Sequence, residues 1–423
     1  MKARIFEMED KKEKIIISGI HTGSADRISD TTDESVAELE ELIKTAGGET
    51  EGILIQNKSE IDSGTYLGSG KLEELKDCCC ALEADTVVFD NELSPVQLKN
   101  ITDYLGVKVL DRSMLILDIF AMRAKSGEGK LQVELAQLKY TLPRLRGMGS
   151  SMSRTGGGIG TRGPGETRLE TDRRHINRRI HALEEEIKEL AKHRDLIRSR
   201  RKKDGVITAA LVGYTNAGKS TLLNCLTDAG VFAEDKLFAT LDPTSRAITL
   251  PDNRQILLVD TVGFIRKLPH HLINSFKSTL EEAAVADVLL EVIDASDDMY
   301  RDKIAVTESV LSDIGAGGKP IIGVYNKTDM CRDTVGFCDF DRNVLISAKN
   351  KTGIDELIAA LSDAAPGKKR KCTLNIPYSD GSVLGMLHER EKILSEEYTE
   401  NGILISALLD REAEEKLKGY LEK

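Results

Sequence analysis

The sequence lacks the features that mark membrane and secreted proteins. No apolar run in its 423 residues approaches the length of a membrane-spanning helix, and Met1 to Lys14 is charged, without the apolar segment of a signal peptide. Its seven cysteines show no paired spacing of a disulfide framework. Cys78, Cys79 and Cys80 cannot jointly bind one metal on a helix, because neighbouring side chains point in different directions, so we expect core or half-buried thiols. These absences favour a soluble protein of the reducing cytoplasm that does not contact membranes.

Composition and charge describe an ordinary globular chain with one unusual segment. Apolar residues make up 40% and charged residues 30% of the sequence, and the length suggests two to four domains. The net charge is −11, yet residues 126–203 hold 19 Lys and Arg against 10 Asp and Glu, so the rest of the chain carries −20. A solvated helical face usually mixes both signs, and an excess of +9 instead favours a basic arm that contacts RNA.

One loop carries the clearest chemical signal. It follows an apolar run at 206–212 that predicts a buried strand, and residues 221–226 predict the start of a helix. The pattern G-x-x-x-x-G-K-S is made by Gly213, Tyr214, Thr215, Asn216, Ala217, Gly218, Lys219 and Ser220. Glycines let backbone N–H groups turn towards phosphates. The sequence therefore predicts a P-loop in which Lys219 reaches the β- and γ-phosphates and acts in catalysis, while the Ser220 hydroxyl ligates Mg²⁺.

Two further segments complete the expected phosphate site. The apolar run 256–259 leads into Asp260, Thr261, Val262 and Gly263. Asp260 is placed to hold Mg²⁺ through water, and the Gly263 N–H can meet a γ-phosphate. Between this run and the P-loop lies a segment of Phe238, Ala239, Thr240, Leu241 and Asp242, followed by Pro243 and Thr244. A threonine hydroxyl from such a mobile loop can ligate Mg²⁺ in the triphosphate state alone, and either threonine could serve.

Guanine recognition is predicted at two later strand ends. The run 320–325 leads into Asn326, Lys327, Thr328 and Asp329, and the run 344–346 leads into Ser347, Ala348 and Lys349. A carboxylate at Asp329 can accept hydrogen bonds from N1 and the exocyclic amine of guanine, which adenine cannot offer. Lys327 would lie over the base, and a backbone N–H at 347–349 would reach O6. Each segment alone could be a polar turn, but five in order at strand ends indicate a GTP-binding domain.

The motif set resembles the HflX-type GTPases of the translation-factor-related class. The match outside the nucleotide motifs is carried by residues 109–113, 115–120, 128–138, 142–145, 163–167 and 238–244. It covers about residues 1–366. The resemblance implies association with the large ribosomal subunit and splitting of stalled or idle ribosomes, often linked to stress. Its pattern also selects Thr240 over Thr244 as the Mg²⁺ ligand and as a catalytic residue.

Phe264 departs from the signalling GTPases. Ras-like proteins carry at this position the glutamine that orients the attacking water, and phenylalanine cannot hydrogen-bond that water. Phe264 could simply pack under its loop, or it could make hydrolysis wait for a partner. The two interpretations are compatible.

The basic segment has two heptad series of apolar residues. The first consists of Leu131, Leu135, Leu138, Leu142 and Leu145, and the second of Ile176, Ile180, Leu183, Ile187, Leu190 and Ile197, with Arg194 in one seam position. Two such stripes in one chain predict an antiparallel helical hairpin rather than a dimerising coiled coil, and we expect a monomer. Pro143 should end the first helix near residue 141 or 142. Gly127 and Gly129 should separate it from a helix at 113–125.

The expected tip of this hairpin, residues 146–168, is rich in Gly, Ser and Arg. It has little to bury, and Arg146, Arg154, Arg162 and Arg168 favour a loop that orders on RNA over a tolerated insert.

The segments flanking the hairpin and the GTP-binding motifs predict two smaller units. Strands at 15–19, 53–56, 86–90 and 107–110 with helices at 32–46, 71–83 and 95–105 predict an N-terminal α/β domain. Its stretch 64–71 resembles a P-loop but has the wrong spacing, so a helix cap is expected, with RNA or nucleotide contact as the alternative. After the basic residues 368–371, strands at 372–377 and 402–409 and helices at 381–392 and 411–421 predict a small α+β module.

The expected fold is α/β: a P-loop GTPase domain with a mostly parallel, doubly wound sheet at 204–366, an N-terminal α/β domain at 1–112, a helical linker and hairpin arm at 113–203, and a C-terminal α+β module at 367–423. The expected function is GTP hydrolysis to GDP and phosphate, with Mg²⁺, stimulated by the large ribosomal subunit. One alternative is an RNA-binding or ribosome-assembly scaffold whose GTPase domain is a slow switch. Another is a membrane- or tRNA-modifying GTPase, which the absence of amphipathic and Cys-based catalytic signals disfavours.

Overall fold

A computed structural model describes residues 12–23, 31–145, 164–203, 205–227, 237–238, 240–268, 277–331, 334–367, 370–399, 402–409 and 411–421. The chain divides into two compact units. The first comprises residues 1–196, 234–242 and 262–280, and the second comprises residues 197–233, 243–261 and 281–423. Two short stretches of the expected GTPase domain therefore group with the N-terminal part of the chain. None of the helices in the described ranges combines the length and the apolar character needed to cross a membrane.

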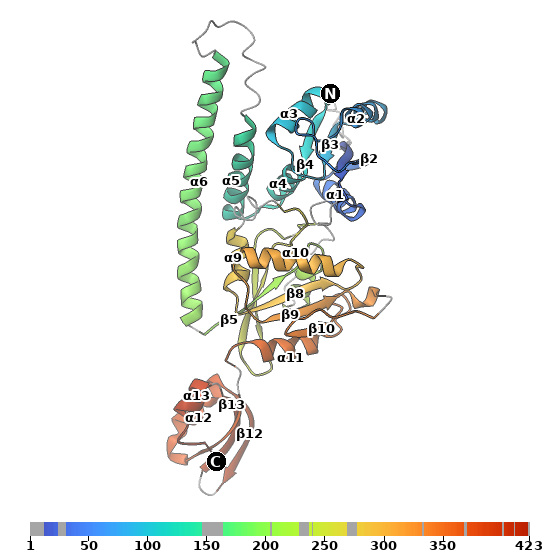
Figure 1. Cartoon of the computed structure of the whole chain (residues 1–423). Coiled ribbons are helices and arrows are strands. Elements are labelled where there is room, and N and C mark those ends of the chain that lie inside the picture. Colours follow the sequence, from blue (N-terminus) through green and yellow to red (C-terminus); the bar gives the residue numbers. More distant parts are fainter. Residues whose placement is uncertain are drawn as a thin grey trace, which may run out of the picture. The chain divides into compact units, whose positions relative to one another are not determined.

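The first unit contains a four-stranded, fully parallel sheet (Figure 1). Its strands, in the order β2-β1-β3-β4, are β1 (Lys14–His21), β2 (Glu49–Asn57), β3 (Thr86–Phe89) and β4 (Lys108–Asp111). The helices between them are α1 (Asp33–Ala46), α2 (Ser69–Leu82) and α3 (Pro95–Leu105). The predicted alternation of strands and helices is confirmed, and β1, β3 and β4 are mostly buried, whereas the edge strand β2 is partly exposed.

The P-loop-like stretch in this unit is a helix start. Gly68 is the N-cap residue of α2, and its N–H donates to Oε1 of Gln56 at 2.9 Å. The preceding turn is closed by Asp62, which accepts from Gly64 N at 2.8 Å and Thr65 N at 2.9 Å. Within α2, Cys79 is buried and Cys78 half-buried as expected, whereas Cys80 is exposed.

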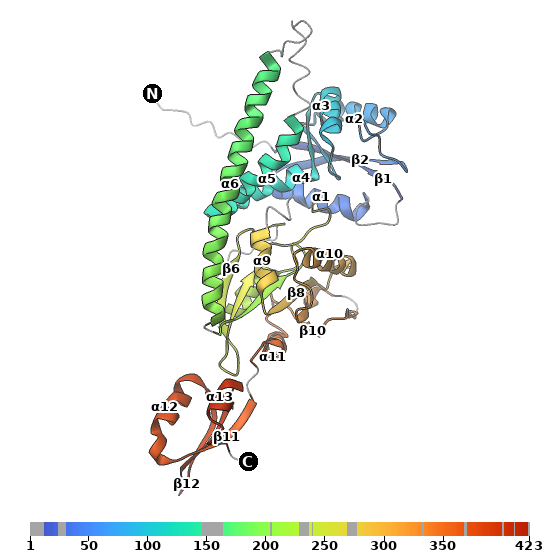
Figure 2. The ribbon, with the colours of Figure 1, turned by 60° about the vertical axis from the view of Figure 1, so that its left-hand side comes forward.

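The arm consists of α4 (Arg112–Arg123), α5 (Gly127–Arg144) and α6 (Pro164–Lys203). Figures 1 and 2 show α5 and α6 side by side, and leucines of α5 pack against Ile176, Ile180, Leu183 and Ile187 of α6. The predicted hairpin is thus confirmed for these positions. Leu190 and Ile197 instead remain exposed, by 37% and 38%. The seam ends there because α6 has 40 residues and α5 only 18, so the end of α6 has little of α5 to pack against.

Three sequence expectations for the arm were wrong in detail. Helix α5 continues through Pro143 to Arg144, because Pro143 falls in the last turn, where its missing N–H removes only one helical hydrogen bond. The break before α5 lies at residues 124–126, and Gly127 and Gly129 belong to its first turn. Helix α6 begins already at Pro164, inside the expected tip, since proline is favourable in a first turn. The tip residues Arg146, Arg154 and Arg162 lie outside the described residues.

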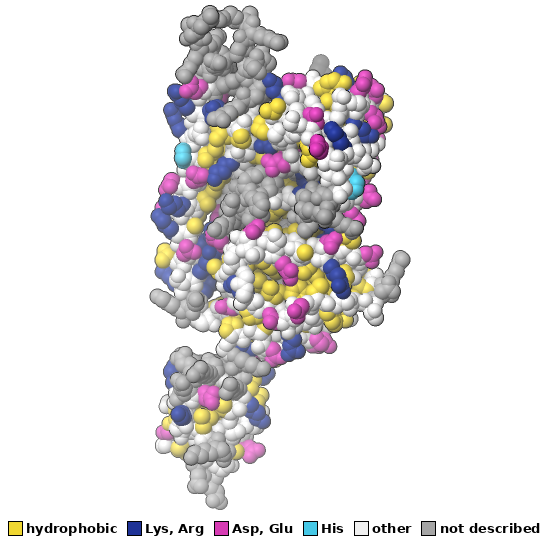
Figure 3. All heavy atoms as spheres, viewed as in Figure 1, with side chains coloured by type: hydrophobic (Ala, Val, Ile, Leu, Met, Phe, Trp, Pro, Cys, Tyr) yellow, Lys and Arg dark blue, Asp and Glu magenta, His cyan; other side chains and the backbone are white. Residues whose placement is uncertain are grey.

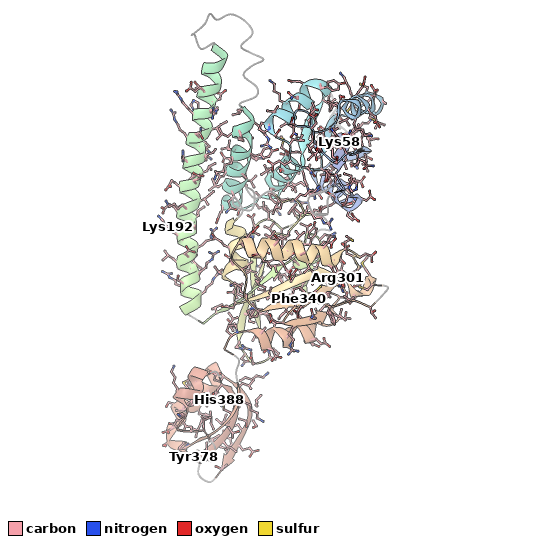
Figure 4. All side chains as sticks on the ribbon, viewed as in Figure 1. Lys58, Lys192, Arg301, Phe340, Tyr378 and His388 are labelled. Carbon is pink, nitrogen blue, oxygen red and sulfur yellow. The ribbon has the colours of Figure 1, made fainter. Side chains whose placement is uncertain are left out.

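The second unit contains a six-stranded sheet in the order β10-β9-β8-β5-β7-β6, parallel except for the edge strand β6. Its strands are β5 (Ile207–Val212), β6 (Thr244–Thr249), β7 (Gln255–Asp260), β8 (Val288–Asp294), β9 (Ile321–Asn326) and β10 (Arg342–Leu345). Its helices are α7 (Lys219–Thr227), α9 (Lys277–Val285), α10 (Tyr300–Asp313) and α11 (Ile354–Ala364), with the 3₁₀ turn η2 (Thr328–Met330). Figure 4 labels two residues of this unit, Arg301 in α10 and Phe340 shortly before β10. The expected mostly parallel doubly wound sheet is confirmed.

The C-terminal module pairs β11 (Arg370–Ile376), β13 (Gly402–Leu409) and β12 (Lys392–Thr399) in an antiparallel sheet. Its helical turns are η3 (Tyr378–Asp380), α12 (Gly381–Arg390) and α13 (Arg411–Lys416), and Figure 4 labels Tyr378 and His388 within it. Strand β12 was missed in the sequence. Its glutamates and serine hide the alternation of an edge strand, which only pairing with β13 reveals. The last helix is shorter than expected.

Strand β8 carries an unusual buried acid. Glu291 is 1% exposed, and neither carboxylate oxygen has a hydrogen-bond partner in the part of the chain that the structure describes. Burial, with a smaller contribution from the negative charge of Glu308, raises the pKa of Glu291 to about 8. The side chain therefore folds in its neutral form near neutral pH.

The Glu291 pKa predicts a dependence of stability on pH. The ordinary pKa is 4.5, so the folded state binds more protons than the unfolded state between pH 4.5 and about 8, and stability falls as the pH rises through this window. Glu291→Gln cannot ionise. Its free energy of unfolding should therefore exceed that of the parent protein by a margin that grows from pH 5 to pH 8, to about 2–4 kcal/mol. Thermal unfolding across this range measures it, with Glu356→Gln, on the exposed face of α11, as the control. Parallel curves for the parent and Glu291→Gln would contradict the assignment.

Candidate nucleotide-binding site

The P-loop joins the end of β5 to the start of α7, and two glycines are required by its backbone. Gly213 has φ +134°, and a Cβ there would overlap the carbonyl oxygen of Val292. Gly218 has φ +96°, and a Cβ there would overlap the side-chain amide of Asn326. Positive φ and close approach of neighbouring groups are the two conditions that exclude other residues. The loop therefore has the predicted strand–loop–helix context.

Lys219 is folded back onto the backbone of its own loop. Its ammonium donates to the carbonyl oxygens of Gly213 at 3.0 Å and Tyr214 at 2.7 Å. Burial lowers the pKa of Lys219 to about 8, although the nearby carboxylate of Asp260 acts in the opposite direction. An anion in the loop would offset this desolvation, so the lysine is primed to receive phosphate charge.

Ser220 and Asp260 meet at the base of the loop. The Ser220 hydroxyl donates to Oδ2 of Asp260 at 2.6 Å, and the Thr261 hydroxyl fixes the end of β7 by donating to Leu211 O at 2.7 Å. A hydroxyl and a carboxylate are oxygen donors of the kind Mg²⁺ prefers. These two residues therefore fit the ion that the sequence predicts.

Asn326 ties the phosphate loop to the expected base loop. Its amide donates to Ala217 O at 2.9 Å, and its amide oxygen accepts the N–H of Ala348 at 3.0 Å. The side chain is 3% exposed, so both hydrogen bonds are protected from water. One buried amide thus connects three of the predicted segments.

Asp329 is oriented by a neighbour that the sequence did not reveal. The Ser347 hydroxyl donates to its Oδ1 at 2.6 Å, and this hydrogen bond is the main cause of a lowered pKa of Asp329. Lys327 forms an ion pair with Asp294 at 2.7 Å, and Thr328 donates to Ile346 O at 2.9 Å. The carboxylate is therefore ionised and held in place, as an acceptor for guanine N–H groups must be. Lys349 lies near enough to lower the same pKa.

The remaining P-loop residues have structural surroundings. Tyr214 is 6% exposed, and the ammonium of Lys303 lies 4.9 Å from its ring centroid. The hydroxyl of Thr215 is buried and has no hydrogen-bond partner among the residues described, and Asn216 adopts a left-handed φ of +62°. Lys303 and Asp294 were missed in the sequence. Their only signal was their place in the chain, since Asp294 is the last residue of β8 and Lys303 lies in α10, the helix that follows.

The other expected phosphate-site residues belong to the first unit. The Phe238 ring packs edge-on against Phe120, with 4.7 Å between centroids, Leu241 is 2% exposed and Thr240 is half-buried. Ala239 lies outside the described residues.

Beyond β7, Val262, next to Gly263, is 5% exposed, and Phe264 is 1% exposed, in accord with the packing role considered for it. The contribution of Thr240 and Gly263 to a phosphate site stays a prediction.

The fold and these contacts define a P-loop GTP-binding protein. Models of three protein families match the chain: "GTP-binding GTPase N-terminal" at residues 33–121, "GTP-binding GTPase Middle Region" at 123–201, and "50S ribosome-binding GTPase" at 208–327.

Relatives along nearly the whole length give the particular family. A GTPase HflX of Caldanaerobacter subterraneus subsp. tengcongensis is 51% identical over 98% of this chain and 95% of its own. The GTPase HflX of Escherichia coli is 40% identical over 94% and 93%. The chain belongs to the HflX family of GTPases; it binds and hydrolyses GTP. It is also similar to a GTP-binding protein from Sulfolobus solfataricus solved with GDP, 26% identical over 83% of this chain and 98% of the other, with a TM-score of 0.44.

The base assignment predicts a change of specificity. Asp329→Asn should lose the guanine contact and favour a xanthine nucleotide, whose 2-oxo group suits an amide donor. We expect GDP affinity to fall by about two orders of magnitude, because guanine N–H groups would be left without an acceptor. Competition of GDP and XDP for a fluorescent nucleotide measures this. Ser347→Ala is a milder comparison, since it removes only the orienting hydroxyl. Unchanged GDP affinity in Asp329→Asn would refute the assignment.

Proposed function

We propose that this GTPase binds the large ribosomal subunit and promotes splitting of stalled or idle ribosomes, with GTP hydrolysis stimulated by the ribosome. The proposal rests on the family membership, on the "50S ribosome-binding GTPase" match at residues 208–327, and on one observation. That observation is the row of exposed Lys and Arg side chains along the long helix α6, whose ion pairs are themselves exposed.

The basic surface is built by exposed Lys and Arg side chains of α6. Dark blue Lys and Arg side chains follow α6 in Figure 3, and Figure 4 shows Lys192 pointing outwards. The exposed members are Arg174, Arg178, Arg179, Lys188, Lys192 and Arg200. Some of them form exposed ion pairs within the arm, such as Lys192 with Glu189 at 2.6 Å. Such surface pairs contribute little, so RNA phosphates can replace the carboxylates.

The proposed chemistry assigns a role to each motif. Lys219 binds the β- and γ-phosphates, and the Gly263 N–H contacts the γ-phosphate. The bound Mg²⁺ would neutralise developing phosphate charge, held by Ser220, by Thr240 in the triphosphate state, and by Asp260 through water. Asp329 selects guanine, and the backbone at 347–349 contacts O6.

Phe264 supports the dependence on a partner. It is buried where a water-orienting glutamine is found in Ras-like proteins, and its ring offers no hydrogen bond to water. Slow intrinsic hydrolysis, accelerated on the ribosome, follows from this substitution.

We also propose the division into domains at residues 1–112, 113–203, 204–366 and 367–423, a monomeric state, and a cytoplasmic location. The second candidate function, an RNA-binding or ribosome-assembly scaffold with a slow GTPase switch, is favoured by the same basic helix and by Phe264. GTP turnover with and without large ribosomal subunits separates the two. Strong stimulation supports the first function, and turnover that stays slow supports the scaffold.

Salt dependence tests the basic surface directly. Each RNA phosphate neutralised by Lys or Arg releases counterions, so affinity for large subunits should fall steeply with salt. Arg178→Glu combined with Lys188→Glu should reduce the slope of log affinity against log salt by about one per lost phosphate contact. Lys44 is an exposed residue of α1, outside the basic surface, so Lys44→Glu is the control and should leave the slope unchanged. If the affinity of the parent protein did not change with salt, the interface would have to lie on the acidic domains instead.

A further inference from the structure

Two segments that the sequence singled out separately meet at the start of α5. The carboxylate of Asp242 accepts the N–H of Lys125 at 3.0 Å and of Ser126 at 2.8 Å, and it also accepts the Ser126 hydroxyl. Ser126 is the N-cap residue of α5, and its hydroxyl oxygen accepts the N–H of Gly129 at 2.8 Å. Asp242 therefore continues the cap of α5 from a segment 116 residues away. A negative charge is also favourable at this end of a helix.

The fit of the carboxylate explains a glycine in the first turn of α5. A Cβ at Gly129 would lie 2.5 Å from Oδ1 of Asp242 and 2.9 Å from Oγ of Ser126. A Cβ at Gly127, two residues earlier in the same turn, would meet nothing within 4 Å. The two glycines thus differ in one respect that matters: only Gly129 makes room for Asp242.

The segment before Asp242 is anchored to the same place. The Phe238 ring packs edge-on against Phe120 in α4, directly before the junction with α5. Thr240 lies between these two anchors and is two residues from Asp242. A displacement of Thr240 by more than the reach of two residues, about 7 Å, must therefore break the Asp242 contact or move the start of α5.

We propose that Asp242 is a positioning residue that couples the Thr240 loop to the helical arm. In the nucleotide-free and GDP states its carboxylate caps α5 and restrains Thr240. In the triphosphate state Thr240 moves to the bound Mg²⁺, and Asp242 leaves the start of α5. This inference rests on the proposed role of Thr240. Because coupling is reciprocal, anything that fixes Asp242 on α5 opposes the triphosphate state, and anything that releases it favours that state.

The matched glycines give the test. Gly129→Ala displaces Asp242, so affinity for a non-hydrolysable GTP analogue with Mg²⁺ should rise about fivefold relative to GDP, the size expected for loss of one helix cap. Gly127→Ala has the same change in helix propensity and should leave the ratio unaltered. Ser126→Ala, which removes the shared hydroxyl, should shift the ratio in the same direction as Gly129→Ala. A lowered ratio in Gly129→Ala, or equal shifts in both glycine variants, would overturn the proposal.

Amide hydrogen exchange in the full chain measures the coupling between the Thr240 loop and the start of α5, and it needs no ribosome. In the parent protein, amides at 125–131 should exchange faster with the GTP analogue than with GDP, whereas in Gly129→Ala they should be fast in both states. Equal exchange in the two states of the parent would contradict the coupling. Thr240→Ala separates this from failure of the proposed function. If it leaves the Mg²⁺-dependent preference for the analogue intact, the role of Thr240 is wrong, whatever the exchange at α5 shows.

Discussion

The nucleotide site depends on one buried amide. Asn326 donates to Ala217 O in the phosphate loop and accepts from Ala348 N in the base loop. Without it, a buried carbonyl and a buried N–H would both lose their partners, at a cost of about 1–3 kcal/mol each. Its position also explains Gly218, whose missing side chain leaves room for the amide. The geometry of the phosphate loop and of the base loop is therefore set by one side chain that hydrogen-bonds to both.

The protonation of several charged groups in this protein is set by burial and by hydrogen bonds. Burial lowers the pKa of Lys219 and raises that of Glu291, while a hydroxyl donor lowers that of Asp329. Lys219 has the backbone carbonyls of its own loop as partners and lies where phosphate charge is expected. The desolvation of its ammonium would therefore be offset when a nucleotide binds. Glu291 has no partner and no role in the proposed chemistry. The cost of its burial is carried by the apolar core around it.

The sequence predicts best what is local. The P-loop, the acidic strand end at Asp260 and the Asn326 motif were found because short-range chemistry fixes their spacing. Strand β12 was missed because it is defined by its pairing with β13, whereas the end of α5 was misplaced by only two or three residues, since Pro143 is tolerated in a last turn. The hydrogen bonds from the start of α5 to Asp242 join residues more than a hundred positions apart, and no local sequence pattern predicts them.

The most direct test of the central claim compares two nucleotides in Asn326→Ala. Inosine diphosphate lacks the 2-amino group that Asp329 is proposed to bind, so the pair GDP and IDP separates base reading from loop geometry. The amide of Asn326 organises both loops, and the 2-amino group is assigned to Asp329 instead. Affinity for both nucleotides should therefore fall by the same factor, about tenfold or more. A selective loss of GDP binding, or unchanged affinity for both in a variant that remains folded, would contradict the account.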